Sequence, residues 1–368
     1  MEVINSLNWE DTIIGRVLAD DVVSQSGHFL LRRGTVLTHW HLNILKNHSI
    51  EEIRLKEQTE PPVNLELKQV FKHKEPLSTH YYENIKEIKR LFQDAISKQV
   101  PSLQEFMVPF TPLMETVLKG PDIFLELRHI KGHDEYTFRH CLNVGLLSAT
   151  IGKILRYSHS ETVKLGTMGF LHDIGKMKVS LQILNKEDPL TEEEFKEIQN
   201  HTIYGRDILK EMYGTSEDII NGALYHHERM NGSGYPFGIK KEEIPFLAQI
   251  IAVADVYDAI SSDRIYRDKF TPFEALDELV QEVYKDKLNG EIVFPFVSHI
   301  LNGYIGKEVE LSDGSKGEIV QLFMEEINRP LVKIGDDFID LKTERKLHIK
   351  DVYIPDKNFA FNSNKEDL

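Results

Sequence analysis

The sequence contains little cysteine, no long apolar run and no excess of positive charge. Its 368 residues include one cysteine, Cys141, which excludes an internal disulfide framework and favours a reducing compartment. The absence of a run of about 18 apolar residues, and of an N-terminal apolar signal segment, predicts a cytoplasmic protein without membrane insertion. The formal net charge of −15 argues against binding to a nucleic-acid polymer, because neutralising phosphates requires clustered lysine and arginine. An anionic ligand would therefore need local positive charge from metal ions or a few directed side chains.

Changes in the hydrophobic period divide the chain into four segments. Residues 1–58 read as a small α+β module, because short apolar runs broken by glycine accompany one amphipathic helix over about residues 38–45. Residues 59–120 combine a linker with long amphipathic helices, whose apolar stripe is either core or the seam of a homodimer. Residues 121–304 are helical in pattern, and residues 305–368 alternate like β-strands before a polar end.

Several boundaries inside the helical segment can be predicted. Thr191, with Glu194 three residues later, forms a capping box for a helix that reaches His201. The stretch 228–245 is rich in glycine and proline and must be a loop, whereas residues 176–189 read as a loop with short turns. The apolar stretch 247–260 predicts a buried helix.

Histidines and aspartates recur through this segment. The adjacent pair His172-Asp173 would be weak evidence alone, because such pairs are common at helix ends and on surfaces. A buried aspartate such as Asp255 is costly unless it binds a metal or, alternatively, pairs with an arginine. The full set is of the kind that a two-metal site needs: His140, His172, Asp173, His201, His226, His227 and Asp255.

The ligand types restrict the metal. Imidazole and carboxylate favour divalent transition metals, so we expect two such ions, iron or manganese first, with zinc, cobalt or nickel as alternatives. Cys141 reads as a small buried filler rather than a ligand or nucleophile. A carboxylate can bridge two ions about 3.5–4 Å apart, and such ions can lower the pKa of a shared water toward ~7. The resulting hydroxide could attack a phosphodiester.

The histidines and aspartates belong to a series of ordered motifs. The motifs are His140, His172-Asp173 with Gly175-Lys176, His201, His226-His227-Glu228-Arg229, Gly234-Tyr235-Pro236, Asp255 and Arg264-Ile265-Tyr266-Arg267. Together they resemble the HD-GYP family, a branch of the HD-domain metal phosphohydrolases known as bacterial cyclic di-GMP phosphodiesterases. The resemblance runs from about residue 133 to about residue 300. It implies an all-helical catalytic domain, so the expected fold is mainly α, with a small α+β module before it and a small β module after it.

The resemblance also implies roles for individual residues. Lys176 would contact the scissile phosphate and, with Asp173, take part in catalysis. Arg264 and Arg267 would bind substrate phosphate, with ion pairs to neighbouring aspartates as the alternative, and Tyr235 would shape the loop beside the bound substrate. One metal ion would be held by His140, His172, Asp173 and Asp255, and the second by Asp173, His201, His226 and His227.

The resemblance leaves three functions open. The first is metal-dependent hydrolysis of cyclic di-GMP, with either linear pGpG or GMP as the final product. The second is a receptor that binds the cyclic dinucleotide without cutting it, and the third is a hydrolase for another cyclic dinucleotide or a phosphomonoester. Some family members hold a third metal ion through a glutamate four residues before the first histidine, but Tyr136 occupies that position here. Because Glu135 would point about 100° away on a helix, we expect two ions.

Overall fold

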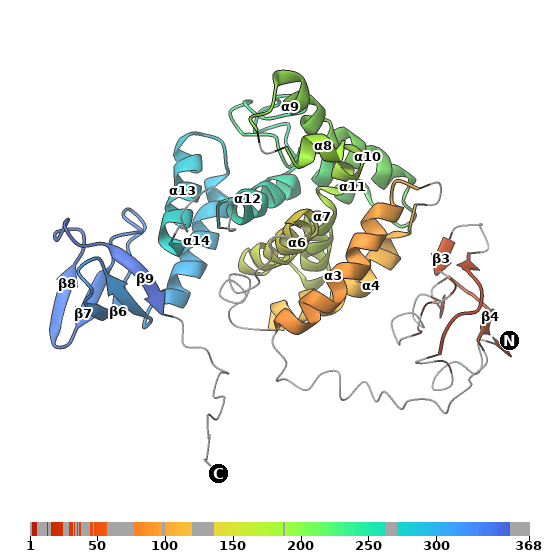
Figure 1. Cartoon of the computed structure of the whole chain (residues 1–368), viewed down its shortest axis with the longest axis horizontal. Coiled ribbons are helices and arrows are strands. Elements are labelled where there is room, and N and C mark those ends of the chain that lie inside the picture. Colours follow the sequence, from red (N-terminus) through yellow and green to blue (C-terminus); the bar gives the residue numbers. More distant parts are fainter. Residues whose placement is uncertain are drawn as a thin grey trace, which may run out of the picture. The chain divides into compact units, whose positions relative to one another are not determined.

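The fold is mainly helical, with small sheets toward both ends, as the sequence predicts (Figure 1). The computed structural model describes residues 77–97, 100–119, 136–186, 188–261 and 271–353, together with parts of residues 2–56. The chain divides into two compact units, Met1–Asp255 and Val256–Leu368. The four-segment division of the sequence stays a prediction. No helix in the described ranges is long and apolar enough to cross a membrane.

Two small antiparallel sheets form near the N-terminus. β1 (Glu2–Asn5) pairs with β4 (Glu52–Leu55), and β2 (Val22–Val23) pairs with β3 (Phe29–Leu31). Buried aliphatic side chains of this segment form a small core of their own, against which Tyr213 also packs. The helix predicted here falls mostly outside the described residues.

The long amphipathic helices α3 (Leu77–Asp94) and α4 (Leu103–Lys119) contribute their apolar stripe to the core of the first unit. Phe92 and Phe110 are fully buried and contact Phe170 of α7 (His159–Leu171), with ring centroids 5.6 and 4.4 Å away. The stripe is therefore core within the chain, and a homodimer through these helices stays a prediction.

Helix α6 (Tyr136–Ile154) packs closely against α7 because small residues line their contact. A Cβ placed on Gly169 would lie 2.6 Å from the carbonyl oxygen of Val144 and 2.5 Å from Ser148 Oγ. The approach is functionally relevant because α6 carries His140 and α7 ends at His172.

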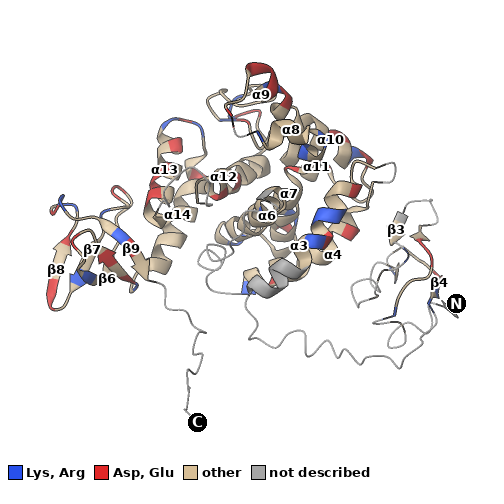
Figure 2. Cartoon of the chain, in the orientation of Figure 1, with Lys and Arg blue, Asp and Glu red and all other residues tan. Residues whose placement is uncertain are grey.

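Short helices complete the first unit. The predicted loop over 176–189 contains the end of the 3-10 helix η2 (Ile174–Lys178) and α8 (Leu181–Leu184). α9 (Glu192–Gln199) begins with the predicted capping box. The three glutamates of its first turn lie at the positive end of the helix dipole, where negative charge stabilises the helix (Figure 2). His201 opens the next helix, α10 (His201–Glu211).

The remaining helices frame the predicted loop. α11 (Glu217–Tyr225) precedes residues 228–245, which contain no helix, and α12 (Phe246–Ser261) follows them. The loop and α12 agree with the sequence prediction. The boundary between the two compact units falls within α12, immediately after Asp255.

The second unit contains α13 (Pro272–Tyr284) and α14 (Gly290–Tyr304), followed by the predicted β module. Its five-stranded antiparallel sheet has the order β8-β7-β6-β5-β9. The strands are β5 (Glu308–Leu311), β6 (Lys316–Gln321), β7 (Leu331–Ile334), β8 (Asp337–Asp340) and β9 (Ile349–Tyr353).

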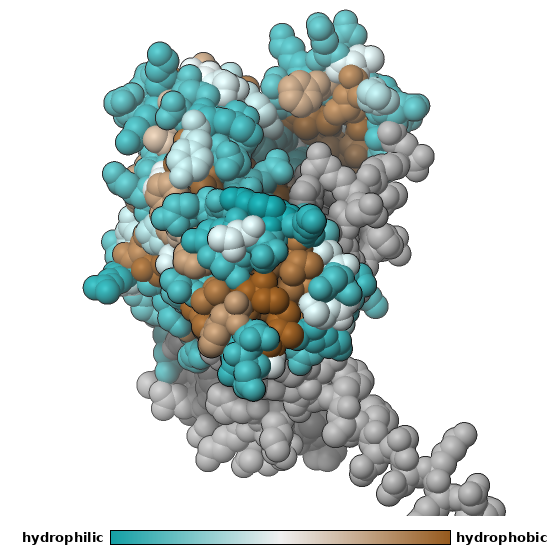
Figure 3. Space-filling model, turned by 90° about the vertical axis from the view of Figure 1, so that its left-hand side faces the viewer, coloured by the Kyte–Doolittle hydropathy of each residue, from teal (hydrophilic) through white to brown (hydrophobic). Residues whose placement is uncertain are grey.

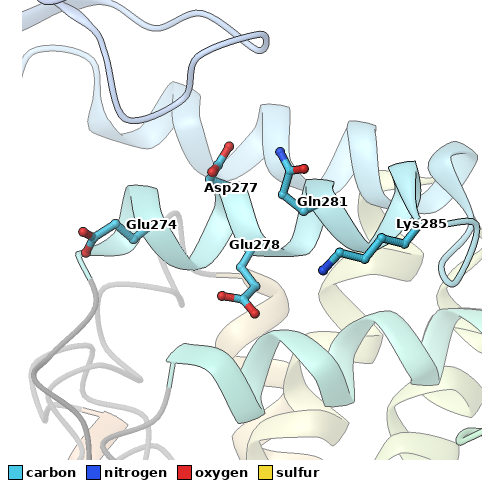
Figure 4. Close-up of a pocket in the computed structure, with 5 residues that line it drawn as sticks. All are labelled: Glu274, Asp277, Glu278, Gln281 and Lys285. Atoms are coloured by element: carbon cyan, nitrogen blue, oxygen red, sulfur yellow. The ribbon is translucent and has the colours of Figure 1, made fainter. Parts of the chain in front are cut away.

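One face of α13 carries a row of acidic side chains beside Gln281 and Lys285, lining a pocket of about 300 Å³ (Figure 4). Burial, together with Glu278, raises the pKa of Asp277 in this row. Apolar side chains gather in limited patches on the face shown in Figure 3, and Phe338 of β8 is 61% exposed.

The contact between α6 and α7 can be tested at Gly169. Gly169→Ala places a methyl group against the Val144 carbonyl, so it should lower the free energy of unfolding by about 1–3 kcal/mol. Gly205→Ala in α10 is the control, because its Cβ would meet only ordinary contacts at 3.4 Å or more. Alanine is the better helix former, so this control should be neutral or stabilising. Urea unfolding followed by circular dichroism measures both, and equal stabilities of the two variants would contradict the prediction.

Candidate metal centre

The seven side chains predicted as metal ligands lie together in the first unit. They come from five helices or helix ends, and all are buried except His227, whose side chain is 17% exposed. Their donor atoms fall into two groups, within each of which all atoms lie within 4.8 Å of one another. One group is Asp173, His201, His226 and His227, and the other is His140, His172 and Asp255.

Asp173 lies between the two groups. Its Oδ1 is 3.2 Å from His201 Nε2, whereas its Oδ2 is 3.3 Å from His172 Nε2 and 3.6 Å from His140 Nε2. The two carboxylate oxygens thus face different groups. This is the arrangement that a bridging ligand requires.

Asp255 also faces both groups from α12. Its Oδ1 is 3.0 Å from His140 Nε2, and its Oδ2 is 3.7 Å from His227 Nδ1. The alternative considered for Asp255, an ion pair with an arginine, is not found among the described residues.

Backbone carbonyls orient three of the imidazole rings. The Nδ1 atoms of His172, His201 and His226 lie 2.7, 2.6 and 2.9 Å from the carbonyl oxygens of Gly169, Ile198 and Ala223. Because a carbonyl oxygen only accepts, each Nδ1 carries the proton and donates it. In the neutral ring, the lone pair of Nε2 then points toward the centre of the cluster.

Lone pairs therefore face one another inside the cluster. The Nε2 atoms of His201 and His226 are 3.3 Å apart, although neither carries a proton in this neutral tautomer. His172 Nε2 and Asp173 Oδ1 are buried atoms that make no hydrogen bond with the described residues. Such contacts are unfavourable unless a cation lies among them. The donor set therefore fits divalent metal binding.

Burial and neighbouring histidines keep His226 and His227 unprotonated, which is the form of histidine that binds a metal ion. Burial lowers the pKa of His226 well below its usual value, with His172 and His201 adding to the effect. Burial and His226 act in the same way on the pKa of His227.

The two carboxylates stay ionised against burial. For Asp173, burial would raise the pKa, but the Lys176 ammonium outweighs it and holds the pKa well below the usual value. For Asp255, the hydrogen bond with His140 opposes burial, and the pKa again lies well below the usual value.

The segment η2 brings Asp173 and Lys176 to the cluster. Lys176 Nζ makes a charge-assisted contact with Asp173 Oδ2. Although burial would lower the pKa of Lys176, the Asp173 carboxylate raises it, so the ammonium form persists. Lys176 is thus a fixed positive charge beside the donor atoms.

Tyr235, from the loop after α11, covers one side of the cluster. Its ring centroid lies 4.5 Å from that of His227, with the planes 31° apart, and 6.2 Å from that of His201. Burial and the carboxylates of Asp173 and Asp255 raise its pKa, so the phenol is neutral. This position agrees with the predicted role of a loop residue beside the site.

Some predicted residues lie outside the described part of the chain. Arg264 and Arg267 belong to residues 262–270, and Glu135 precedes the first described residue of α6. Their predicted roles, and the expectation of two ions that rests in part on Glu135, stay predictions.

Two residues at the site were missed as functional candidates. Cys141 is buried, as predicted for a filler, but its sulfur lies within 4.8 Å of donor atoms of His172 and Asp173. Glu228 is 2% exposed and accepts hydrogen bonds from the loop that carries Tyr235. The only sequence signal was its place directly after the His226-His227 pair.

Comparisons with known proteins agree with the predicted fold. Residues 123–292 match the family model described as HD domain. A cyclic di-GMP phosphodiesterase of Pseudomonas aeruginosa is 32% identical over 244 residues, which cover 66% of this chain and 58% of the relative. A 3'3'-cGAMP-specific phosphodiesterase of Vibrio cholerae is 32% identical over 189 residues, which cover 50% of this chain and 44% of the relative. The chain thus spans about half the length of these curated relatives.

A solved structure shows the same fold. The HDG"Y"P protein Bd1817 of Bdellovibrio bacteriovorus aligns with a TM-score of 0.51 at 17% identity, covering 81% of this chain and 98% of that one. The histidine–aspartate cluster lies within residues 123–292, the segment that matches the HD domain. More particularly, the predicted resemblance of this chain to the HD-GYP family is confirmed.

The histidine pKa shifts predict how the metal-free protein responds to pH. Because His226 and His227 resist protonation when folded, the unfolded state binds more protons below about pH 6.5, where ordinary histidine titrates. The free energy of unfolding should therefore fall by up to about 1.4 kcal/mol per pH unit for each of the two histidines between pH 6 and pH 5. Asp173 and Asp255 add no slope there, because they are ionised in both states.

Urea unfolding of the metal-free protein at pH 7.5, 6 and 5 measures this slope. His226→Gln should reduce it, because one of the two proton-resisting groups is gone. His348→Gln is the control, since that residue is exposed and lies in the β module. A wild-type stability independent of pH in this range would contradict the prediction.

Proposed function

We propose that this protein is a metal-dependent phosphodiesterase that hydrolyses cyclic di-GMP to linear pGpG. The observation that carries the proposal is the set of inward-facing nitrogen and oxygen lone pairs arranged around Asp173. The names of the relatives, cyclic di-GMP and cGAMP phosphodiesterases, support the substrate class.

The cluster would hold two divalent ions that share Asp173. His140, His172 and Asp255 would complete the first set of ligands, and His201, His226 and His227 the second. Iron or manganese suits these donors best, with zinc, cobalt or nickel as alternatives. When bound, the ions would lower the pKa of a coordinated water and so supply a nucleophile at neutral pH.

The side chains around the cluster would bind and orient the phosphodiester. Lys176, already charged beside Asp173, would neutralise negative charge that develops on the phosphoryl oxygens. Arg264 and Arg267 would bind substrate phosphate, and Tyr235 would bound the site on the His227 side.

Two other functions remain to be separated by experiment. A receptor would bind cyclic di-GMP without turnover, and a hydrolase of different selectivity would prefer another cyclic dinucleotide. The second has specific support, because relatives in Vibrio cholerae are named cGAMP-specific phosphodiesterases.

The catalytic role of Lys176 gives a direct test. Lys176→Met should reduce kcat for cyclic di-GMP by about 100-fold or more while bound metal is retained, because an ammonium near the reacting phosphate is lost and no donor atom is changed. Lys178→Met, an exposed lysine in the same short helix, should keep wild-type kcat. Anaerobic incubation with Fe(II) or Mn(II) and chromatography of the products measures the rates.

The same assay on the wild-type protein distinguishes hydrolysis of cyclic di-GMP from the two other functions. Binding of cyclic di-GMP without pGpG formation in either metal would overturn hydrolysis in favour of the receptor. Faster turnover of cGAMP than of cyclic di-GMP would instead revise the substrate.

The shared position of Asp173 predicts a different outcome for a ligand variant. Asp173→Asn keeps the size of the side chain but removes the charge facing both groups, so metal content should fall from two ions per chain to less than one. Elemental analysis of anaerobically purified protein measures the content. Retention of two ions in Asp173→Asn would show that Asp173 is not the bridge.

A further inference from the structure

Glu228 is a buried carboxylate with an unusual set of partners. The residue is 2% exposed, and no ion pair to it exists among the described residues. Burying a carboxylate is unfavourable unless hydrogen bonds replace its water. Here Oε1 accepts from the backbone N–H of Phe237 at 2.7 Å, and Oε2 accepts from that of Ile239 at 3.1 Å. Both oxygens are thus used to hold the far side of the loop that follows His226-His227.

The same loop is held to the histidine pair at other points. The backbone N–H of Tyr235 donates to the carbonyl oxygen of His227 at 3.2 Å. A Cβ on Gly234 would lie 2.4 Å from that oxygen and 2.5 Å from Glu228 Cα, so glycine allows this approach. As a result, the Tyr235 ring lies against the His227 ring.

From this geometry we propose that Glu228 is a positioning residue of the metal centre. By accepting from Phe237 and Ile239, its carboxylate fastens the loop, and the fastened loop holds Tyr235 against His227. The ring of His227, which is the most exposed of the seven candidate ligands, is thereby covered and oriented. Glu228 itself touches neither metal nor substrate. The effect on turnover rests on the proposed phosphodiesterase function, whereas the effect on the loop does not.

The chemistry of the two acceptors suggests the variant. Glu228→Gln keeps shape and volume, but its amide nitrogen would face a backbone N–H, and two donors cannot bond to each other. Glu228→Asp keeps two acceptors but is one methylene shorter, so it cannot reach both N–H groups. Glu242→Gln is the matched control, because Glu242 is an exposed acid of the neighbouring segment and its change removes the same charge.

The loop can be followed independently of activity. In zinc-loaded protein labelled with 3-fluorotyrosine, the Tyr235 resonance is assigned by its absence in Tyr235→Phe. In Glu228→Gln this resonance should shift and broaden on addition of a soluble paramagnetic agent, whereas Glu242→Gln should match the wild type. Turnover of cyclic di-GMP should fall roughly 10- to 100-fold in Glu228→Gln, the range found when a residue supporting a metal ligand is lost.

A double-mutant cycle of Glu228 and Gly234 distinguishes a positioning role of Glu228 from general destabilisation. Gly234→Ala should also expose the Tyr235 ring, and so shift and broaden the same resonance, because it disturbs the other side of the contact. The double variant Glu228→Gln, Gly234→Ala should lose little more turnover than the worse single variant. If Glu228→Gln does not fold, Glu228→Asp takes its place in the cycle.

An unmoved Tyr235 resonance in Glu228→Gln would overturn the proposal, whatever happens to turnover. Fully additive losses in the double variant would overturn it as well. An inactive wild type would refute the proposed function but leave the resonance test in force.

Discussion

The close approach of η2 to α10 is the constraint on which the site depends. A Cβ on Gly175 would lie 1.9 Å from the carbonyl oxygen of His201 and 2.4 Å from the backbone nitrogen of Gly205. Any side chain at this position would push the two segments apart. Because Asp173 stands two residues before Gly175 and His201 opens α10, the missing side chain sets the distance between the central aspartate and one group of histidines. The backbone packing of η2 against α10 therefore determines part of the geometry of the candidate metal site.

Within the described part of the chain, positive side chains balance the negative charge of the cluster only in part. Asp173 and Asp255 are buried and ionised, and one lysine, Lys176, contacts one of them. Burying an uncompensated carboxylate costs several kcal/mol, so the remaining negative charge favours cations in the site. Binding to the folded state alone would then stabilise the protein by mass action. The same imbalance that makes the metal-free site unfavourable is what would give it affinity for divalent ions.

The cluster of seven side chains could be predicted from sequence because residue type and order carry most of that information. Histidine and aspartate at helix ends, in a fixed order, indicated the seven residues that the structure brings together. Contacts between segments carried no such signal. The hydrogen bonds of Glu228, the proximity of Cys141 and the pairing of β9 with β5 each depend on tertiary geometry. Gly175 stood within the predicted motif, but the carbonyl that it approaches could be identified only in three dimensions.

Helix ends explain why the ligands sit where they do. The last carbonyl groups of a helix lack partners within it, and a nearby donor stabilises them. His172, His201 and His226 each donate from Nδ1 to the carbonyl three residues earlier, at the ends of α7, α9 and α11. One bond therefore serves two purposes, since it caps the helix and fixes the tautomer that turns Nε2 inward. Because three helices end in the same way at one place, the helical scaffold itself orients the donor atoms, and a divalent ion would only have to occupy the space that the lone pairs surround.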